Sequence, residues 1–401
     1  MDASLPEFSN PTAITNPLFP VGTVRQVIQL GVDHGLPLRV EVTLMPDTRT
    51  IEWNGQPVET LVSQFISYRG GRILEVAYDY FAQADDGSVW YFGEQVDNYA
   101  DGGVANHGGA WLAGEDGPPG MIMPALPRRG DVYRPENIPG LVFEEVVVLE
   151  ANVVTAGPTG QVSGAIRIEE HLMGGSTEQK LFAPGYGEFR TEANDELVAM
   201  GLAVPTDARA EDPPGGLARI ADAARGIFDD LSSEDWTTVA EALDEMSGAW
   251  REITASPTPP LLADQMAAAL AHLATAAEKR DVGAAQYAAV DTALATFDLL
   301  LQYRDATAMD LERMELWARR LLADAGSAAE VRGDVATLET IWDRVRHAVD
   351  SADVDAVEGQ LATARAAADT DDTREAVAAA EALIAHLNDA RGSLLSAARG
   401  Y

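Results

Sequence analysis

The chain has 401 residues, a formal net charge of −36 at pH 7 and no cysteine. This length exceeds one ordinary domain core, so two domains are expected. The negative charge argues against binding to nucleic acid or to an anionic membrane surface, and the lack of cysteine excludes disulfides and thiolate metal sites.

Several cofactor and membrane signals are also missing from the sequence. There is no c-type haem motif, no Gly-x-Gly-x-x-Gly and no Gly-Lys-Ser/Thr loop, so we expect no haem and no nucleotide. No apolar run approaches about 18 residues, which predicts no transmembrane segment. Met1–Ser4 is not followed by basic and apolar regions, so no signal peptide is expected in the chain.

Residues 16–204 are predicted to form an antiparallel β domain. Turn residues recur at the spacing typical of all-β folds, and apolar residues alternate with polar ones between them. We expect a half-barrel or a barrel-like sheet. The predicted strands are Thr23–Leu30, Leu38–Leu44, Val58–Ser67, Ile73–Ala82, Val89–Glu94, Val142–Val153, Gln161–His171 and Glu178–Ala183.

The most distinctive part of this domain is a hairpin followed by a long segment. Val89–Glu94 is expected to pair with Tyr78–Gln83 through a turn that contains Asp86-Gly87, because Gly tolerates positive φ. The segment Asp97–Pro139 is rich in Gly and Pro. We expect it to be a loop that covers one side of the sheet, since loops of this length are often functional.

The chain changes character near residue 205. The segment 205–216 mixes charged residues with Pro and Gly, which is typical of a linker. Residues 217–398 then show apolar positions at alternating spacings of three and four, which predicts an all-α domain. Candidate turns near Ser233, Val282, Gly326 and Asp371 divide it into about four helical hairpins.

Aromatic and methionine side chains gather in the hairpin and the segment after it. Alternate residues of a strand share a face, so both faces of the hairpin carry aromatic rings. One interpretation is a packed core with the long loop above it. The other is an apolar pocket. Its proposed ligand-binding residues are Tyr80, Trp90, Phe92, Trp111, Met121 and Met123.

A second candidate site lies in the helical region. Glu339, Asp343 and His347 are four residues apart and share one helix face, where they could bind a divalent metal. The alternative is that they form the polar border of a buried seam. A divalent metal is the only cofactor that the sequence suggests.

One part of the sequence is specific enough to suggest relatives. It comprises Asp79–Gln83, Asp86-Gly87, Val89–Glu94, Gly109–Trp111, Ala113-Gly114, Asp116-Gly117, Pro119-Gly120, Met123–Ala125, Pro127, Gly130 and Tyr133-Arg134. This pattern resembles a family of uncharacterised secreted bacterial proteins and lipoproteins. The resemblance implies an extracytoplasmic location and an all-β first domain, and it brings no catalytic residues.

Three functions are compatible with these features. The first is non-catalytic, extracytoplasmic binding of a small apolar or amphipathic ligand by the β domain. The second is a scaffolding role in a cell-envelope assembly with a protein partner. The third is divalent-metal binding by the helical domain. No catalytic motif was found, so an enzyme is not the expected class.

Overall fold

The structure is a computed structural model that describes residues 6–397. It divides into two compact units. The β unit comprises Met1–Tyr99 and Val104–Asp207, and the helical unit comprises Ala100–Gly103 and Ala208–Tyr401. The boundary at Asp207 lies inside the segment 205–216 that the sequence predicts as the linker. No described helix is long and apolar enough to cross a membrane.

The β unit contains a single open antiparallel sheet, in which fourteen strands are described. Along the sheet the order is β6-β5-β4-β3-β2-β1-β14-β13-β12-β11-β10-β9, with β7 and β8 also paired to β5. The strands are β1 (Gln26–Asp33), β2 (Leu36–Trp53), β3 (Gln56–Arg69), β4 (Arg72–Gln83), β5 (Val89–Ala100), β6 (Gly103–Asn106), β7 (Trp111–Leu112), β8 (Gly120–Met123), β9 (Val132–Ile138), β10 (Val142–Ala156), β11 (Gln161–Leu172), β12 (Thr177–Ala183), β13 (Gly187–Ala193) and β14 (Glu196–Val204).

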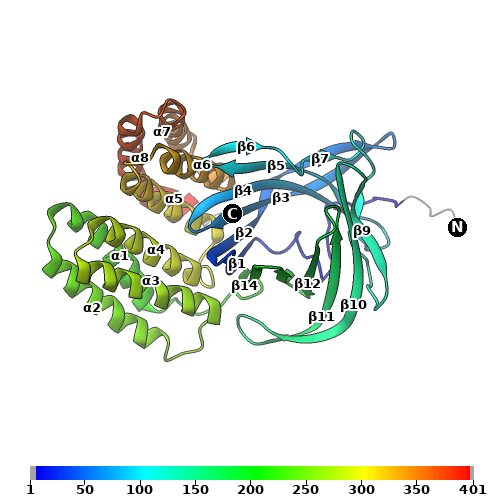
Figure 1. Ribbon diagram of the computed structural model, residues 1–401, viewed down its shortest axis with the longest axis horizontal. Helices are drawn as coiled ribbons and strands as arrows, with labels where there is room; N and C mark the ends of the chain where they lie inside the picture. The colour runs from blue at the N-terminus through cyan, green and yellow to red at the C-terminus, as the bar shows by residue number, and fades with distance from the viewer. Residues whose placement is uncertain (1–5, 398–401) are drawn as a thin grey trace. The chain divides into compact units, whose positions relative to one another are not determined.

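The sheet is strongly curved, as Figure 1 shows, so that β3–β5 and β9–β11 form two walls of its concave side. The predicted antiparallel half-barrel is therefore confirmed, as an open sheet. Every predicted strand is present, and the hairpin pairing of β4 with β5 is as expected. The sequence missed β13 and β14.

The prediction of a long loop over Asp97–Pro139 is corrected by the structure. This segment contains the end of β5 together with β6, β7, β8 and most of β9. Its short strands pair with β5, so it belongs to the sheet. The sequence missed these short strands because two to four residues are too few to show the alternation of apolar and polar side chains that marks a strand. Their backbone hydrogen bonds are made with a neighbouring strand.

The helical unit contains eight described α-helices joined as four hairpins, as predicted (Figure 1). The turns lie at the four predicted places. Capping side chains mark helix starts, for example Asp281, which accepts a hydrogen bond from the Ala284 backbone N–H. The helices are α1 (Gly215–Asp230), α2 (Trp236–Ile253), α3 (Pro260–Lys279), α4 (Val282–Leu300), α5 (Ala306–Ala323), α6 (Ala328–Val345), α7 (Ser351–Asp369) and α8 (Thr373–Ala397).

Candidate functional site

A cavity of about 310 Å³ lies in the β unit. Side chains from β1–β5 line one part of it, and side chains from β9–β13 line the other. These two groups of strands are far apart along the chain. The curvature of the sheet is what brings them to the same space.

One wall of the cavity is aromatic. Phe81 on β4 stacks on Tyr91 on β5 with ring centroids 5.0 Å apart, and Phe19 meets Phe81 edge-on at 4.8 Å. Phe19 precedes β1 and is positioned by the neighbouring buried Asn16. The Asn16 amide donates hydrogen bonds to the carbonyl oxygens of Gly87 and Pro124. The segment before the first strand therefore completes the cavity wall.

A β-bulge in β5 directs two polar side chains into the cavity. Tyr91 pairs with Phe81 and Glu94 pairs with Asp79, so β5 contains one more residue than β4 over this stretch. The extra residue brings Tyr91 and Glu94, three positions apart, to the same face. Gly93 permits this conformation, because its φ is +116° and a Cβ would lie 2.3 Å from the Trp111 carbonyl oxygen.

A second bulge does the same in β9. Tyr133 pairs with Val146 and Glu136 pairs with Glu144, so β9 has the extra residue here. Tyr133 and Glu136 both line the cavity. The sequence Tyr-x-x-Glu thus occurs at both bulges, once on each wall, and delivers a phenol and a carboxyl group each time.

The polar part of the cavity is acidic. Its carboxyl groups belong to Glu75, Asp79, Glu94, Glu136, Glu144, Glu170 and Glu188. Lys180 is the only Lys or Arg among the described lining residues. Its ammonium group lies 2.7 Å from a Glu170 oxygen and 3.5 Å from a Glu188 oxygen. No other Lys or Arg among the described lining residues lies around Glu75, Asp79, Glu94 and Glu136, and the charge of Lys180 opposes the rise that burial causes in the pKa of Glu136.

Burial raises the pKa values of these carboxyl groups, because it disfavours the charged form. The pKa of Asp79 rises to about 7, although a hydrogen bond from the Tyr91 hydroxyl, 2.7 Å long, opposes the shift. Burial also raises the pKa of Glu136 to about 7, and here the opposing hydrogen bonds come from Trp111 at 3.0 Å and from Glu94.

Glu94 keeps its proton more firmly than either neighbour. Burial raises its pKa, and the nearby Asp79 and Glu136 raise it further, to about 10. At pH 7 the Glu94 carboxyl group is therefore protonated and can donate its hydrogen bond to Glu136. On the other wall, burial and the nearby Glu170 raise the pKa of Glu144 to about 9.

The Tyr133 hydroxyl is one of the buried polar groups of the cavity that lack a hydrogen-bond partner among the described residues. Tyr133 is 7% exposed, and its hydroxyl oxygen has no hydrogen-bond partner among the described residues. Burial raises its pKa above the usual value, so the group is a neutral phenol that can donate or accept. A buried polar group without a partner is costly, which marks this place as one where a ligand atom would fit.

The six predicted ligand-binding residues do not line the cavity. They pack in or against the main hydrophobic core, and Trp111 also donates a hydrogen bond to the cavity residue Glu136. Phe92 and Met123 are fully buried in the main core cluster, Tyr80 and Trp111 are nearly so, and Trp90 and Met121 pack at its edge. The Tyr80 ring also stacks under the Arg49 guanidinium, 4.4 Å from its centroid.

Three of the predicted residues, Tyr80, Trp90 and Phe92, lie on the strands that border the cavity but on the face opposite to Phe81 and Tyr91. The cavity is lined by the neighbours Phe81, Tyr91 and Ile122. Because side chains alternate along a strand, a shift of one residue exchanges the two faces. The repeated Tyr-x-x-Glu and the alternation Glu75, Ala77, Asp79, Phe81 were the available signals for the polar face.

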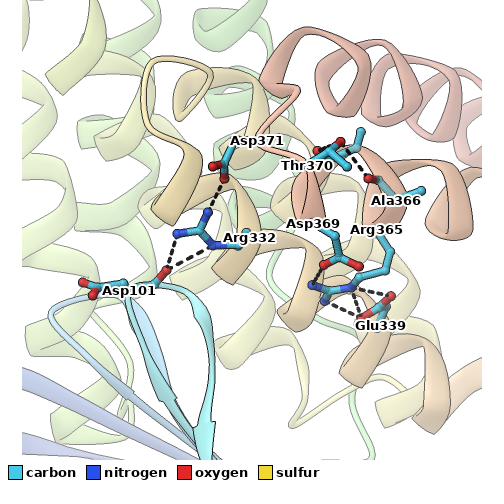
Figure 2. A network of polar contacts seen from close by, with 9 residues as sticks. Asp101, Arg332, Glu339, Arg365, Ala366, Asp369, Thr370 and Asp371 are labelled. Atoms are coloured by element: carbon cyan, nitrogen blue, oxygen red, sulfur yellow. Dashed lines mark hydrogen bonds and ion pairs between the residues drawn. The ribbon is translucent and has the colours of Figure 1, made fainter.

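The predicted metal ligands are not brought together. The carboxylate of Glu339 on α6 pairs with the Arg365 guanidinium at 2.6 Å, and Asp369 contacts the same group, as Figure 2 shows. The Asp343 carboxylate lies 3.9 Å from the Arg346 guanidinium. His347 falls in a short 3₁₀ turn after α6. Among residues 6–397 no group of three or more His, Asp or Glu side chains is arranged to hold a metal ion.

Comparison with known proteins adds no assignment. No protein-family model matches the chain, and no curated protein sequence is significantly similar to it.

Proposed function

We propose that the β unit is a non-catalytic binding module that holds a small amphipathic ligand in its cavity. The observation that carries this proposal is the division of the cavity into an aromatic wall and a polar part. Binding sites of this kind combine apolar surface with a few polar groups that fix the ligand's orientation. The volume of about 310 Å³ suits a small molecule.

We place this binding function outside the cytoplasm on the basis of the sequence pattern around Asp79–Arg134. Its resemblance to secreted bacterial proteins and lipoproteins supports a role outside the cytoplasm. In that setting the helical unit would serve as a spacer or as a docking surface for a protein partner.

A cavity-filling variant tests the proposal. Ile122 and Met121 are neighbours on β8, both partly buried, and only Ile122 lines the cavity. Binding of the neutral fluorescent probe N-phenyl-1-naphthylamine is measured for Ile122→Trp and for the control Met121→Trp. We expect Ile122→Trp to weaken binding at least about tenfold, or about 1.4 kcal/mol, because the indole occupies the cavity.

The control should keep nearly the affinity of the unmodified protein. Equal loss in both variants would point to a general disturbance of β8, and no binding to the unmodified protein would favour the scaffolding role. Native mass spectrometry beside the denatured mass complements this experiment, since a bound small molecule adds mass that is lost on denaturation.

A further inference from the structure

The described residues that line the acidic part of the cavity include more acidic side chains than cationic ones. Lys180 is placed against Glu170 and Glu188, with Glu178 a further 3.8 Å contact. Its charge also opposes the rise that burial causes in the pKa of Glu136. Glu75, Asp79 and Glu94 have no cationic group beside them among the described lining residues. A ligand can supply the missing positive charge.

The hydrogen-bonding groups in the cavity suit a donor-rich ligand. An ionised carboxylate group can accept hydrogen bonds but cannot donate them. The unpartnered Tyr133 hydroxyl can also accept a hydrogen bond. An ammonium group has three donors and no acceptor, so it matches these groups. An anionic head group would instead meet carboxylates, and its burial beside them would be repulsive.

We propose that the cavity selects small amphipathic amines, whose ammonium group binds between Glu94, Glu136 and the Tyr133 hydroxyl while the apolar part lies against Phe81 and Phe19. This inference rests on the proposed binding function and specifies the ligand's chemical class.

The titratable and charged groups that line the cavity come from β4, β5 and β9–β13 and from the turn after β12. They are Glu75 and Asp79 on β4, Tyr91 and Glu94 on β5, Tyr133 and Glu136 on β9, Glu144 on β10, Glu170 on β11, Lys180 on β12, Tyr186 in the turn and Glu188 on β13. A bound ammonium group favours the ionised form of the nearest carboxyl groups and so releases protons from them.

The test compares hexylamine, 1-hexanol and hexanoate by isothermal titration calorimetry with the full chain at about pH 7.5. These probes share an apolar chain and differ in head-group charge. We expect hexylamine to bind at least about tenfold more tightly than hexanol, and hexanoate to bind more weakly than either. Equal affinity for the amine and the alcohol would overturn the amine proposal and leave the binding function standing. No binding of any of the three would count against the binding function itself.

Substitutions test which residues cause the preference for hexylamine over hexanol. Glu136→Gln keeps the shape of the side chain and removes its charge, so the preference for hexylamine over hexanol should fall about tenfold while hexanol binding stays unchanged. Glu94→Gln is a second variant with the same expected direction, should Glu136→Gln disturb the fold. Glu145→Gln is the matched control, because Glu145 lies beside Glu144 on β10, pairs with Arg134 and does not line the cavity. An unchanged preference in both cavity variants would overturn the assignment.

Tyr133→Phe removes only the unpartnered hydroxyl. We expect it to weaken hexylamine binding about threefold with little effect on hexanol. Tighter binding of hexylamine to this variant would show that the hydroxyl does not face the ammonium group.

Discussion

Both units bury charged side chains, but they do so in opposite ways. In the helical unit the Arg313 guanidinium, 1% exposed, bonds to Asp298 at 2.8 Å and to Asp310 at 2.6 Å. In the β unit Asp79 and Glu136 face a cavity in which Lys180, paired with Glu170, is the only Lys or Arg among the described lining residues. The first arrangement is closed and self-sufficient, whereas the second is incomplete.

The pKa values follow this difference. Arg225 and Arg319 flank Glu315 in the helical unit, and their charge lowers the pKa of Glu315 although burial opposes the shift. Burial raises the pKa values of Asp79 and Glu136, because no described cation offsets it at Asp79 and the nearby Lys180 offsets it only in part at Glu136. Paired charges of the first kind are typical of structural networks, while strongly raised pKa values in a cavity are typical of functional sites.

The largest expected loss of stability comes from a substitution that breaks the buried ion-pair network of the helical unit. Arg313→Leu leaves Asp298 and Asp310 buried without their cation, which should lower the free energy of unfolding by about 3–5 kcal/mol. Urea unfolding followed by the helical circular dichroism signal measures it. Arg219→Leu is the control, because the Arg219–Glu252 pair is more than half exposed and should contribute less than about 1 kcal/mol. Similar values for both variants would contradict the distinction.

An intermediate effect is expected at the β5 bulge. In Gly93→Ala the new methyl group would meet the Trp111 carbonyl oxygen, and the backbone has positive φ, so we expect a loss of about 2–3 kcal/mol. The variant should also lose binding of the naphthylamine probe, because Tyr91 and Glu94 lose their common face. Gly174→Ala, which meets nothing within 4 Å, is the control and should leave both quantities unchanged. A stable Gly93→Ala variant with full probe binding would show that the bulge is not needed.

A change of pH is expected to have a smaller effect on stability, and the effect has opposite signs in the two units. Groups with a raised folded pKa bind their proton more tightly in the folded state, so the stability they contribute is lost as pH rises through the folded value. For Asp79 and Glu136 this value is about 7, and the β unit should lose on the order of 1 kcal/mol or more between pH 5 and 8. Glu315 behaves in reverse, and its contribution is lost only as pH falls below about 4.5.

Hydrogen–deuterium exchange resolved by peptide measures the two units separately. Asp79→Asn should flatten the pH dependence of the β unit without changing that of the helical unit. A β unit that becomes more stable from pH 5 to 8 would contradict the raised pKa values.

The sequence by itself determined the helices, most of the longer strands and the division into two units. The seam of Leu217, Ile220 and Ile227 is buried as the spacing predicts, and the alternation in β10 and β11 forms strands. These patterns are local, because the period of the apolar residues reflects the geometry of one helix or one strand. The short strands β6–β8 lacked such a pattern and were predicted as loop.

Only the tertiary structure decided where the site lies. Glu94 on β5 and Glu136 on β9 meet because the sheet curves and each strand carries a bulge. Strict alternation would place Glu94 on the face of Trp90 and Phe92, whereas the bulge brings it to the face of Tyr91. The pKa values of the carboxyl groups likewise depend on burial and on neighbours distant in sequence, which no local pattern contains.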